Sequence, residues 1–402
     1  MSYEKTLDAL AMRLDARMDL TKEWTDDEVR ALIDEEMIAL REIPVGEKRK
    51  LKRDIFNELR GFGVVQDFLE DEDISEIMIN GPEHIFIERN GVLLETDRAF
   101  LSAQKLEEMV QRIAGRMNRS VNTARPIADL RLADGSRVNV VLAPVSVDGT
   151  CVTIRKFLKD SLSIEELIER KSLTKEAAEF LQTVVKARYN ILISGGTGSG
   201  KTTFLNAISA FIPEEERVIT IEDAAELHLQ GIPNLVRLEM RPANLAGEGE
   251  ISMRDLVKTA LRMRPTRILI GETRDGAAAD LLASWNTGHE GSISTIHANT
   301  ASDALARFET LVMMGSEMPL AAIRAQIASA VDIVIQLGRF RDHTRRVQAI
   351  SEVVGMEDGE IILQPLFLWK EGEDGRDKET GGSLIRIGAE MNRTEKFRMY
   401  GG

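Results

Sequence analysis

Apolar side chains recur at helical spacing through the first sixty residues. Leu7, Leu10 and Leu14 lie three or four positions apart, and a second series runs from Val29 to Leu40. Residues three and four apart share one face of an α-helix. The pattern therefore predicts amphipathic helices within residues 1–60.

Short alternating segments typical of β-strands replace this helical pattern after Gly61. Arg89-Asn90-Gly91 and Asp134-Gly135 are turn sequences of the kind that join hairpin strands. Strands are expected at 77–79, 84–88, 128–132 and 136–141, and an amphipathic helix at 103–117. These elements predict a small mixed α/β domain over residues 61–157.

A polar segment at 158–172, which includes Ser163 before a short helix, is expected to be the interdomain linker. Beyond it, short apolar segments alternate with helical ones. Strands are expected at 189–194, 217–221, 235–239, 267–270, 292–296 and 331–337, and a polar loop at 371–382. This βαβ rhythm predicts an α/β domain with a mainly parallel sheet over residues 173–402, including a C-terminal extension.

Composition narrows the compartment and the class of partner. The single cysteine, Cys151, excludes an internal disulfide and suits a reducing compartment, so we expect a cytoplasmic protein. No apolar run approaches the roughly 20 residues of a membrane span, so any membrane association is expected to be peripheral. The formal net charge of -14 argues against direct nucleic-acid binding. A basic run at 48–53 fits either a local basic patch or a solvated helix face.

Residues 195–202 read G-x-x-x-x-G-K-T, the complete motif of a phosphate-binding loop. The glycines let successive backbone N–H groups point at phosphate oxygens, and the helix expected at 202–211 adds the partial positive charge of its N-terminus. Lys201 is expected to reach the β- and γ-phosphates of ATP, Thr202 to bind Mg²⁺ and Thr203 to contact the α-phosphate. The predicted nucleotide-binding residues are Gly196, Thr197, Gly198, Ser199, Gly200, Lys201, Thr202 and Thr203.

Hydrolysis also requires carboxylates near the γ-phosphate, and two predicted strands end in them. Glu222, Asp223 and Glu226 follow the strand at 217–221, and Glu272 follows the strand at 267–270. The carboxyl ends of parallel strands line the ligand crevice. Because glycine stands before Glu272 where many phosphate-loop enzymes have an aspartate, Glu272 is expected to act on Mg²⁺ through water or on the attacking water itself.

A third segment places His289 and His297 at opposite ends of a short strand rich in hydroxyl groups. Each candidate also has a structural interpretation, because a carboxylate at a strand end often caps the next helix and a histidine is often a buried hydrogen-bond donor. The order of the segments favours the catalytic interpretation. It runs from the phosphate loop through the acidic strand and the Glu272 strand to the histidine strand.

The sequence resembles the type II/type IV secretion and pilus-assembly ATPases, and most closely the CpaF-like ATPases of Flp (tight-adherence) pili. The resemblance covers about residues 60–368, and its family-specific motifs lie at 73–81, 134–139, 153–157 and 271–275. It implies a RecA-like ATPase domain, a smaller N-terminal domain and a homohexameric ring. The four-cysteine zinc module of some extension ATPases is missing, which suits the CpaF-like branch.

The resemblance also implies a role for each candidate of the ATPase domain. Glu226 matches the general base, and Glu222 and Asp223 would support the metal and water network. Glu272 matches the Walker B glutamate. His289 and His297 match a histidine box that senses the γ-phosphate.

Arginines complete the implied site. Arg137 and Arg155 match residues that swing from the N-terminal domain onto the nucleotide, where a guanidinium can bind the γ-phosphate through two hydrogen bonds. Alternatively, they are surface arginines that make weak ion pairs. Arg262, Arg264 and Arg274 are further cationic candidates.

The function expected from this resemblance is an ATP-hydrolysing hexameric motor. Its ring would sit beneath platform proteins of the inner membrane and power pilus assembly, with retraction or secretion as further outputs. Two alternatives stay open. The first is a conjugative type IV secretion ATPase or DNA-translocating motor, and the second is a nucleotide-dependent switch, against which the several carboxylates argue.

Overall fold

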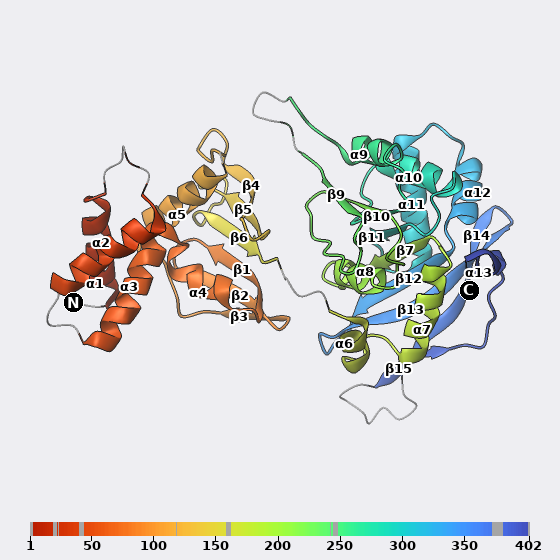
Figure 1. The fold of residues 1–402 in the computed structure, drawn as a ribbon, viewed down its shortest axis with the longest axis horizontal. Coiled ribbons are helices and arrows are strands. Elements are labelled where there is room, and N and C mark those ends of the chain that lie inside the picture. Colours follow the sequence, from red (N-terminus) through yellow and green to blue (C-terminus); the bar gives the residue numbers. More distant parts are fainter. Residues whose placement is uncertain are drawn as a thin grey trace. The chain divides into compact units, whose positions relative to one another are not determined.

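The computed structural model describes residues 3–18, 22, 24–39, 44–117, 119–157, 162–241, 243, 248–371 and 381–400. The chain folds into two compact units, Met1–Leu158 and Lys159–Gly402 (Figure 1). No helix within these described ranges is long and apolar enough to cross a membrane.

Three helices open the first unit and share a small core. They are α1 (Tyr3–Asp15), α2 (Asp26–Ala39) and α3 (Val45–Arg60). Leu14, Val29 and Ile55 are buried between them, together with other residues of the predicted helical series. The expected N-terminal helices are therefore present.

A six-stranded antiparallel sheet forms the rest of the first unit, in the order β3-β2-β1-β6-β5-β4. Leu106 and Ile113 of the covering helix α5 belong to its core. Both predicted hairpins are present, and the first turns at Asn90 and Gly91, which have φ values of 52° and 77°. The elements are η1 (Gly63–Val65), α4 (Gln66–Glu70), β1 (Ile74–Asn80), β2 (His84–Arg89), β3 (Val92–Glu95), α5 (Ala103–Arg116), β4 (Ile127–Arg131), β5 (Arg137–Val141) and β6 (Cys151–Arg155).

A nine-stranded sheet forms the centre of the second unit, in the order β15-β14-β13-β12-β7-β11-β10-β8-β9. The strands from β12 to β9 in this order pair in parallel, which confirms the mainly parallel sheet. The antiparallel extension by β13, β14 and β15 was not predicted. The strands are β7 (Ile191–Gly195), β8 (Val218–Glu222), β9 (Leu235–Glu239), β10 (Arg267–Ile270), β11 (Ile293–Ile296), β12 (Ile333–Arg339), β13 (Arg345–Glu357), β14 (Glu360–Glu371) and β15 (Gly382–Arg386).

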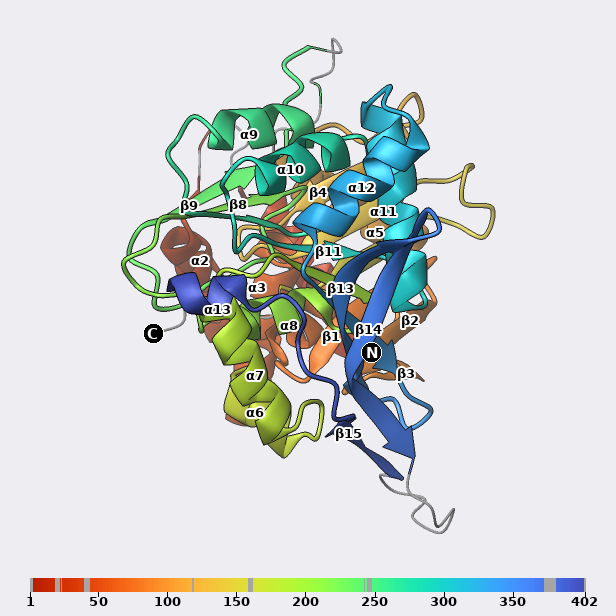
Figure 2. The ribbon, with the colours of Figure 1, turned by 90° about the vertical axis from the view of Figure 1, so that its right-hand side faces the viewer.

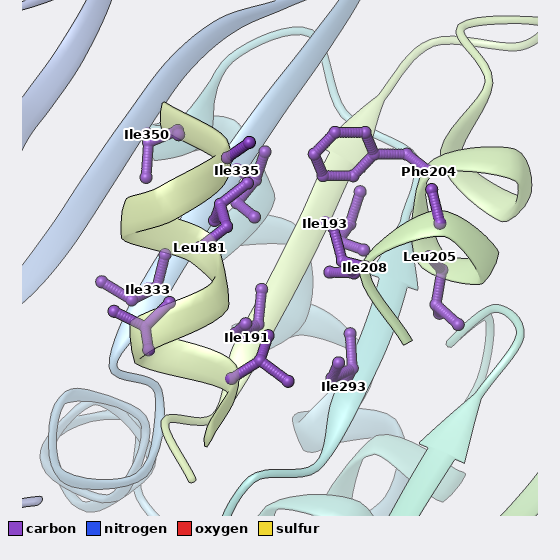
Figure 3. Packing of buried hydrophobic residues seen from close by; sticks show 14 of the residues in the cluster. Leu181, Ile191, Ile193, Phe204, Leu205, Ile208, Ile293, Ile333, Ile335 and Ile350 are labelled. Atoms are coloured by element: carbon purple, nitrogen blue, oxygen red, sulfur yellow. The ribbon is translucent and has the colours of Figure 1, made fainter. Parts of the chain in front are cut away.

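Helices cover both faces of this sheet. Successive side chains of a strand point to opposite faces, so neighbouring residues pack against different helices. Ile191 and Ile193 of β7 pack with α7 and α8 (Figure 3), whereas Leu192 packs in the cluster formed with α9 to α12. Figure 2 shows α9, α10 and α12 on one side of the strands and α7 on the other. The helices are α6 (Ile164–Glu169), α7 (Lys175–Lys186), α8 (Lys201–Ser209), α9 (Met253–Ala260), α10 (Ala277–Asn286), α11 (Ala301–Gly315), α12 (Leu320–Ala330) and α13 (Glu395–Tyr400).

The structure describes only parts of the two segments that the sequence predicts to be a linker and a polar loop. Within the segment predicted as a linker, α6 packs Ile164 and Leu167 into the core of the second unit, and residues 158–161 lie outside the described residues. Of the predicted polar loop at 371–382, residues 372–380 lie outside them as well.

Candidate functional site

Four segments that are far apart in the sequence meet at one edge of the second sheet. The strands β7, β8, β10 and β11 are parallel, so their carboxyl ends lie on the same side. The residues at and after those ends are the phosphate loop, Glu222 with Asp223, Glu272 and His297. Tertiary structure thus gathers most of the predicted site.

The phosphate loop has the backbone that its glycines permit. Gly198 and Gly200 have φ values of 71° and 88°, a region that favours glycine. Helix α8 begins directly after Gly200 and has no side-chain cap, so its first N–H groups are available to an anion. Gly195 is needed for close packing, because a Cβ there would lie 2.4 Å from Oγ of Ser199 and 2.8 Å from the carbonyl oxygen of Leu337.

Lys201 connects the loop to the histidine strand. Its buried ammonium donates to the carbonyl oxygens of Gly195 and Gly196, at 3.0 and 3.1 Å, and lies 3.2 Å from Nδ1 of His297. Burial and the charge of Lys201 lower the pKa of His297, so its imidazole is neutral at pH 7. The partners assign the tautomer, with Nδ1 accepting from Lys201 and Nε2 donating to Oε1 of Glu272 at 3.1 Å.

Arg274 extends this chain of contacts to the acidic strand. Its guanidinium donates to Oε2 of Glu272 and to Oδ2 of Asp223, at 2.7 Å each. The relay therefore runs from Lys201 through His297, Glu272 and Arg274 to Asp223, and it fixes the Glu272 carboxylate from both sides.

Glu222 shapes the same edge from a buried position. Its Oε2 accepts hydrogen bonds of 2.8 Å from the backbone N–H groups of Glu226 and Leu227. Burial raises the pKa of Glu222 to about 7. A Cβ on Gly271 would lie 3.0 Å from Cγ of Glu222, so Glu222 takes the space that an aspartate at position 271 would need.

Glu226 lies beside the first turn of α8. The hydroxyl of Thr202 is 3.5 Å from Oε2 of Glu226, which joins the predicted base to the predicted magnesium-binding residue. Thr203 follows in the same turn, and Gly196 and Thr197 lie in the loop ahead of it.

The chemistry of this edge fits a nucleoside triphosphate with Mg²⁺. Oγ of Ser199 and Oε1 of Glu222 are buried, and neither has a hydrogen-bond partner within the described part of the chain. No group of three or more His, Cys, Asp or Glu side chains that could hold a metal occurs among the described residues.

A cavity of about 600 Å³ opens next to the relay. Arg274 and His297 line it together with Asn299, Asp303 and Arg307. The relay therefore borders a space large enough for a ligand or for a side chain of another protein.

The structure does not bring His289, Arg262 and Arg264 to this edge. His289 precedes β11, and the two arginines precede β10, so all three lie at the amino ends of the strands. A four-residue strand such as β11 is roughly 13 Å long. In this structure these three side chains therefore lie at the opposite edge of the sheet from the phosphate loop, and their roles at the nucleotide stay predictions.

Arg137 and Arg155 belong to the first unit. They are direct partners on the antiparallel strands β5 and β6, so their side chains share one face of the sheet. Arg155 is 57% exposed, and its Nε lies 3.9 Å from Oε1 of Glu76, a distance typical of a weak ion pair.

Sequence reasoning missed Arg345, at the start of β13. A Cβ on Gly200 would lie 3.4 Å from Cδ of Arg345, so this side chain passes close to the phosphate loop. No ion pair or side-chain hydrogen bond of its guanidinium is found among the described residues. The buried residues of β13 come in consecutive runs and do not alternate with exposed ones, so no local signal in the sequence marked this strand.

Comparison with known proteins agrees with this architecture. The family model of the type II/IV secretion system protein matches residues 58–365. The conjugal transfer protein TrbB of Rhizobium radiobacter is 35% identical over 290 residues, covering 71% of this chain and 86% of TrbB. The type IV secretion system protein PtlH of Bordetella pertussis is 34% identical over 297 residues, covering 68% of this chain and 87% of PtlH.

The solved structures include an X-ray structure of the ATPase DotB of Yersinia pseudotuberculosis. It matches with a TM-score of 0.52 at 20% identity, over 71% of this chain and 76% of that one. This likeness shows the fold alone, and it agrees with the expected RecA-like α/β architecture. Because the family model matches more than half of the sequence, the chain belongs to the type II/IV secretion system protein family.

Proposed function

We propose that this chain hydrolyses ATP and that the edge of the second sheet described above is the static part of its active site. The observation that carries the proposal is the relay from Lys201 through His297 to Glu272. It joins the residue that would hold the phosphates to the carboxylate that would act on water or metal. A phosphate loop without such connections would bind a nucleotide but would not hydrolyse it.

The phosphate loop and the first turn of α8 would hold the triphosphate. Residues 196–200 supply backbone N–H groups, Lys201 turns its ammonium from its own loop to phosphate oxygens, and Thr203 contacts the α-phosphate. Thr202 would bind Mg²⁺ directly and Glu272 through water. When bound, Mg²⁺ neutralises charge on the phosphate oxygens.

The carboxylates would divide the work of activating water. Glu226 accepts its proton as the general base, and its location beside Thr202 supports this role. Glu222 positions Glu226 by accepting its backbone N–H. Asp223 and Arg274 hold Glu272 in place, and the neutral His297 responds to the γ-phosphate because it contacts Lys201 directly.

Arg137 and Arg155 would complete the site when the first unit approaches the nucleotide. Their shared face, and the exposure of Arg155, support a role as arginine fingers. Domain movement would then gate hydrolysis, because the transition-state charge is stabilised only when these guanidinium groups arrive.

The motor that we propose is a homohexameric ring of the CpaF-like kind. It works in the cytoplasm against platform proteins of the inner membrane and powers Flp-type pilus assembly, with retraction or secretion as related outputs. Family membership supports a secretion or pilus motor in general. The motifs that resemble CpaF-like ATPases support the pilus in particular.

A conjugative type IV secretion ATPase is the second candidate. The name of the relative TrbB, a conjugal transfer protein, favours it. Deleting the gene in its host and scoring both surface pili and plasmid transfer separates the two. Loss of pili with normal transfer supports the first candidate, and the reverse supports the second.

ATP turnover by two variants tests the site itself. Lys201→Ala should abolish both tight ATP binding and turnover, whereas Glu226→Gln should keep ATP binding and lower kcat by about 10²-fold or more. His228→Gln is the matched control, because His228 is an exposed neighbour of Glu226. Normal turnover by either Lys201→Ala or Glu226→Gln would refute the assignment.

A further inference from the structure

A second, basic cavity lies within the first unit. It has a volume of about 540 Å³ and lies between α2, α3, the segment leading into α4 and the end of α5. Helix α3 contributes Arg49, Lys52, Arg53 and Arg60 to the wall, and these residues repeat at helical spacing. The basic run of the sequence thus contributes one helix face to this cavity.

The remaining lysines of that run point elsewhere. Lys48 donates to the carbonyl oxygen of Met37, and the ammonium of Lys50 lies 4.8 Å from the ring centroid of Tyr3. Neither residue lines the cavity. The run is therefore divided, and a uniformly solvated helix face does not describe it.

Positive charge in the cavity exceeds what its carboxylates neutralise. Six cationic side chains line it, which are Arg30, Arg49, Lys52, Arg53, Arg60 and Arg116, against the two carboxylates of Asp34 and Glu70. Lys52, Arg53 and Arg60 have carboxylate partners, namely Asp34, Asp54 and Asp26.

Three guanidinium groups have no carboxylate partner in the described ranges. They belong to Arg30 of α2, Arg49 of α3 and Arg116 of α5. Arg30 lies 4.0 Å over the ring of Phe56, and Arg116 donates to the carbonyl oxygen of Arg60. The protein has a net charge of -14, yet three helices bring positive charges together in this cavity. These charges make the binding of an anion there more favourable.

We propose that this cavity is a binding site for a phosphate-bearing ligand. Guanidinium groups bind phosphate through paired hydrogen bonds, and the side chains of Asn57 and Gln66 add neutral donors to the lining. The phosphate comes either from a soluble polyphosphate compound or from an acidic phospholipid headgroup. This inference goes beyond the proposed hydrolysis of ATP and does not depend on it.

The test uses the full chain and two probes. Pyrophosphate is titrated in Mg²⁺-free buffer by calorimetry, and vesicles of phosphatidylcholine with or without phosphatidylglycerol are used for co-sedimentation. Arg49→Gln and Arg116→Gln should each weaken binding of the same probe about tenfold, because each removes a charge-assisted hydrogen bond. Pyrophosphate binding identifies a soluble ligand, and binding only to phosphatidylglycerol vesicles identifies a lipid headgroup.

Lys50→Gln is the matched control, since it removes the same charge one residue along α3 but outside the cavity. It should change the affinity less than twofold. Thermal melting of each variant checks that it is folded. The proposal is overturned if neither probe binds the unmodified protein, if Lys50→Gln loses as much affinity as Arg49→Gln, or if folded Arg49→Gln and Arg116→Gln variants bind as tightly as the unmodified protein.

Discussion

Glu222 is a buried carboxyl group with two backbone donors on one oxygen and no partner on the other within the described residues. The donors favour its ionised form, but burial outweighs them and raises the pKa to about 7. A carboxyl whose pKa is higher in the folded state binds its proton more tightly there than in the unfolded chain. Its contribution to stability is therefore complete at low pH and is lost as the pH rises from about 4.5 to 7.

The variant Glu222→Gln should remove this pH dependence. The glutamine oxygen can still accept from Glu226 and Leu227, but the side chain no longer ionises. Urea unfolding of the second unit would be followed from pH 5 to 8. As pH rises, the free energy of unfolding of the variant should increase relative to that of the unmodified protein, by at most about 3 kcal/mol. Curves that stay parallel over this range would contradict the raised pKa.

Arg345 is expected to bind the nucleotide. Its side chain passes close to the phosphate loop, so Arg345→Ala should raise KM for ATP about tenfold and leave kcat within about twofold. Steady-state kinetics would measure both constants. Arg341→Ala, an exposed arginine in the preceding turn, is the matched control and should leave KM unchanged. An unchanged KM in Arg345→Ala would remove Arg345 from the site.

At the scale of elements, the last described residues support the second sheet. Asp332, buried just ahead of β12, accepts from Arg393 at 3.2 Å, from Lys396 at 2.7 Å and from the backbone N–H of Asn190 at 2.7 Å. Phe397 packs its ring 4.8 Å from that of Tyr189. Helix α13 and the residues before it therefore close the amino edge of the sheet.

Removing both cations should destabilise the second unit. Arg393→Ala with Lys396→Ala leaves the Asp332 carboxylate buried without a charged partner, which costs about 3–5 kcal/mol. Urea unfolding would measure this loss. Adding Asp332→Asn should recover part of it, because the buried charge is then gone, and Arg398→Ala serves as a control on the same helix. If the variant with all three substitutions is no more stable than the one without Asp332→Asn, packing alone holds helix α13 and the residues before it.

Individual elements were predictable to different extents. Strands β9 and β10 begin and end where the sequence places them, because each is a short segment rich in Leu, Ile or Val that follows a proline and a polar residue. Strands β13 to β15 and helix α13 were missed. The residues of the three strands alternate weakly, and the strands gain order by pairing with β12 and with one another. Helix α13 gains order from Asp332, which lies far from it in the sequence.

At the scale of the whole molecule, kinetics can test the proposed role of Arg137 and Arg155 as arginine fingers. Replacing Arg137 or Arg155 by alanine should lower kcat about 10³-fold while ATP still binds, because an arginine finger acts mainly on the transition state. Turnover and equilibrium ATP binding measure the two effects separately. Arg98→Ala, an arginine of the first unit paired with Asp67, is the control. Full activity in both Arg137→Ala and Arg155→Ala would limit the active site to the second unit.

The sequence by itself determined the local features of this protein. The glycines of the phosphate loop, the short apolar strands and the carboxylates at strand ends follow from neighbours a few residues apart. Only the tertiary structure decided which side chains meet, because strand direction places His297 at the nucleotide edge and His289 at the opposite one. The contact of Glu222 with Gly271 and that of Arg345 with Gly200 are likewise tertiary. Both depend on the order of strands in the sheet, which no local pattern encodes.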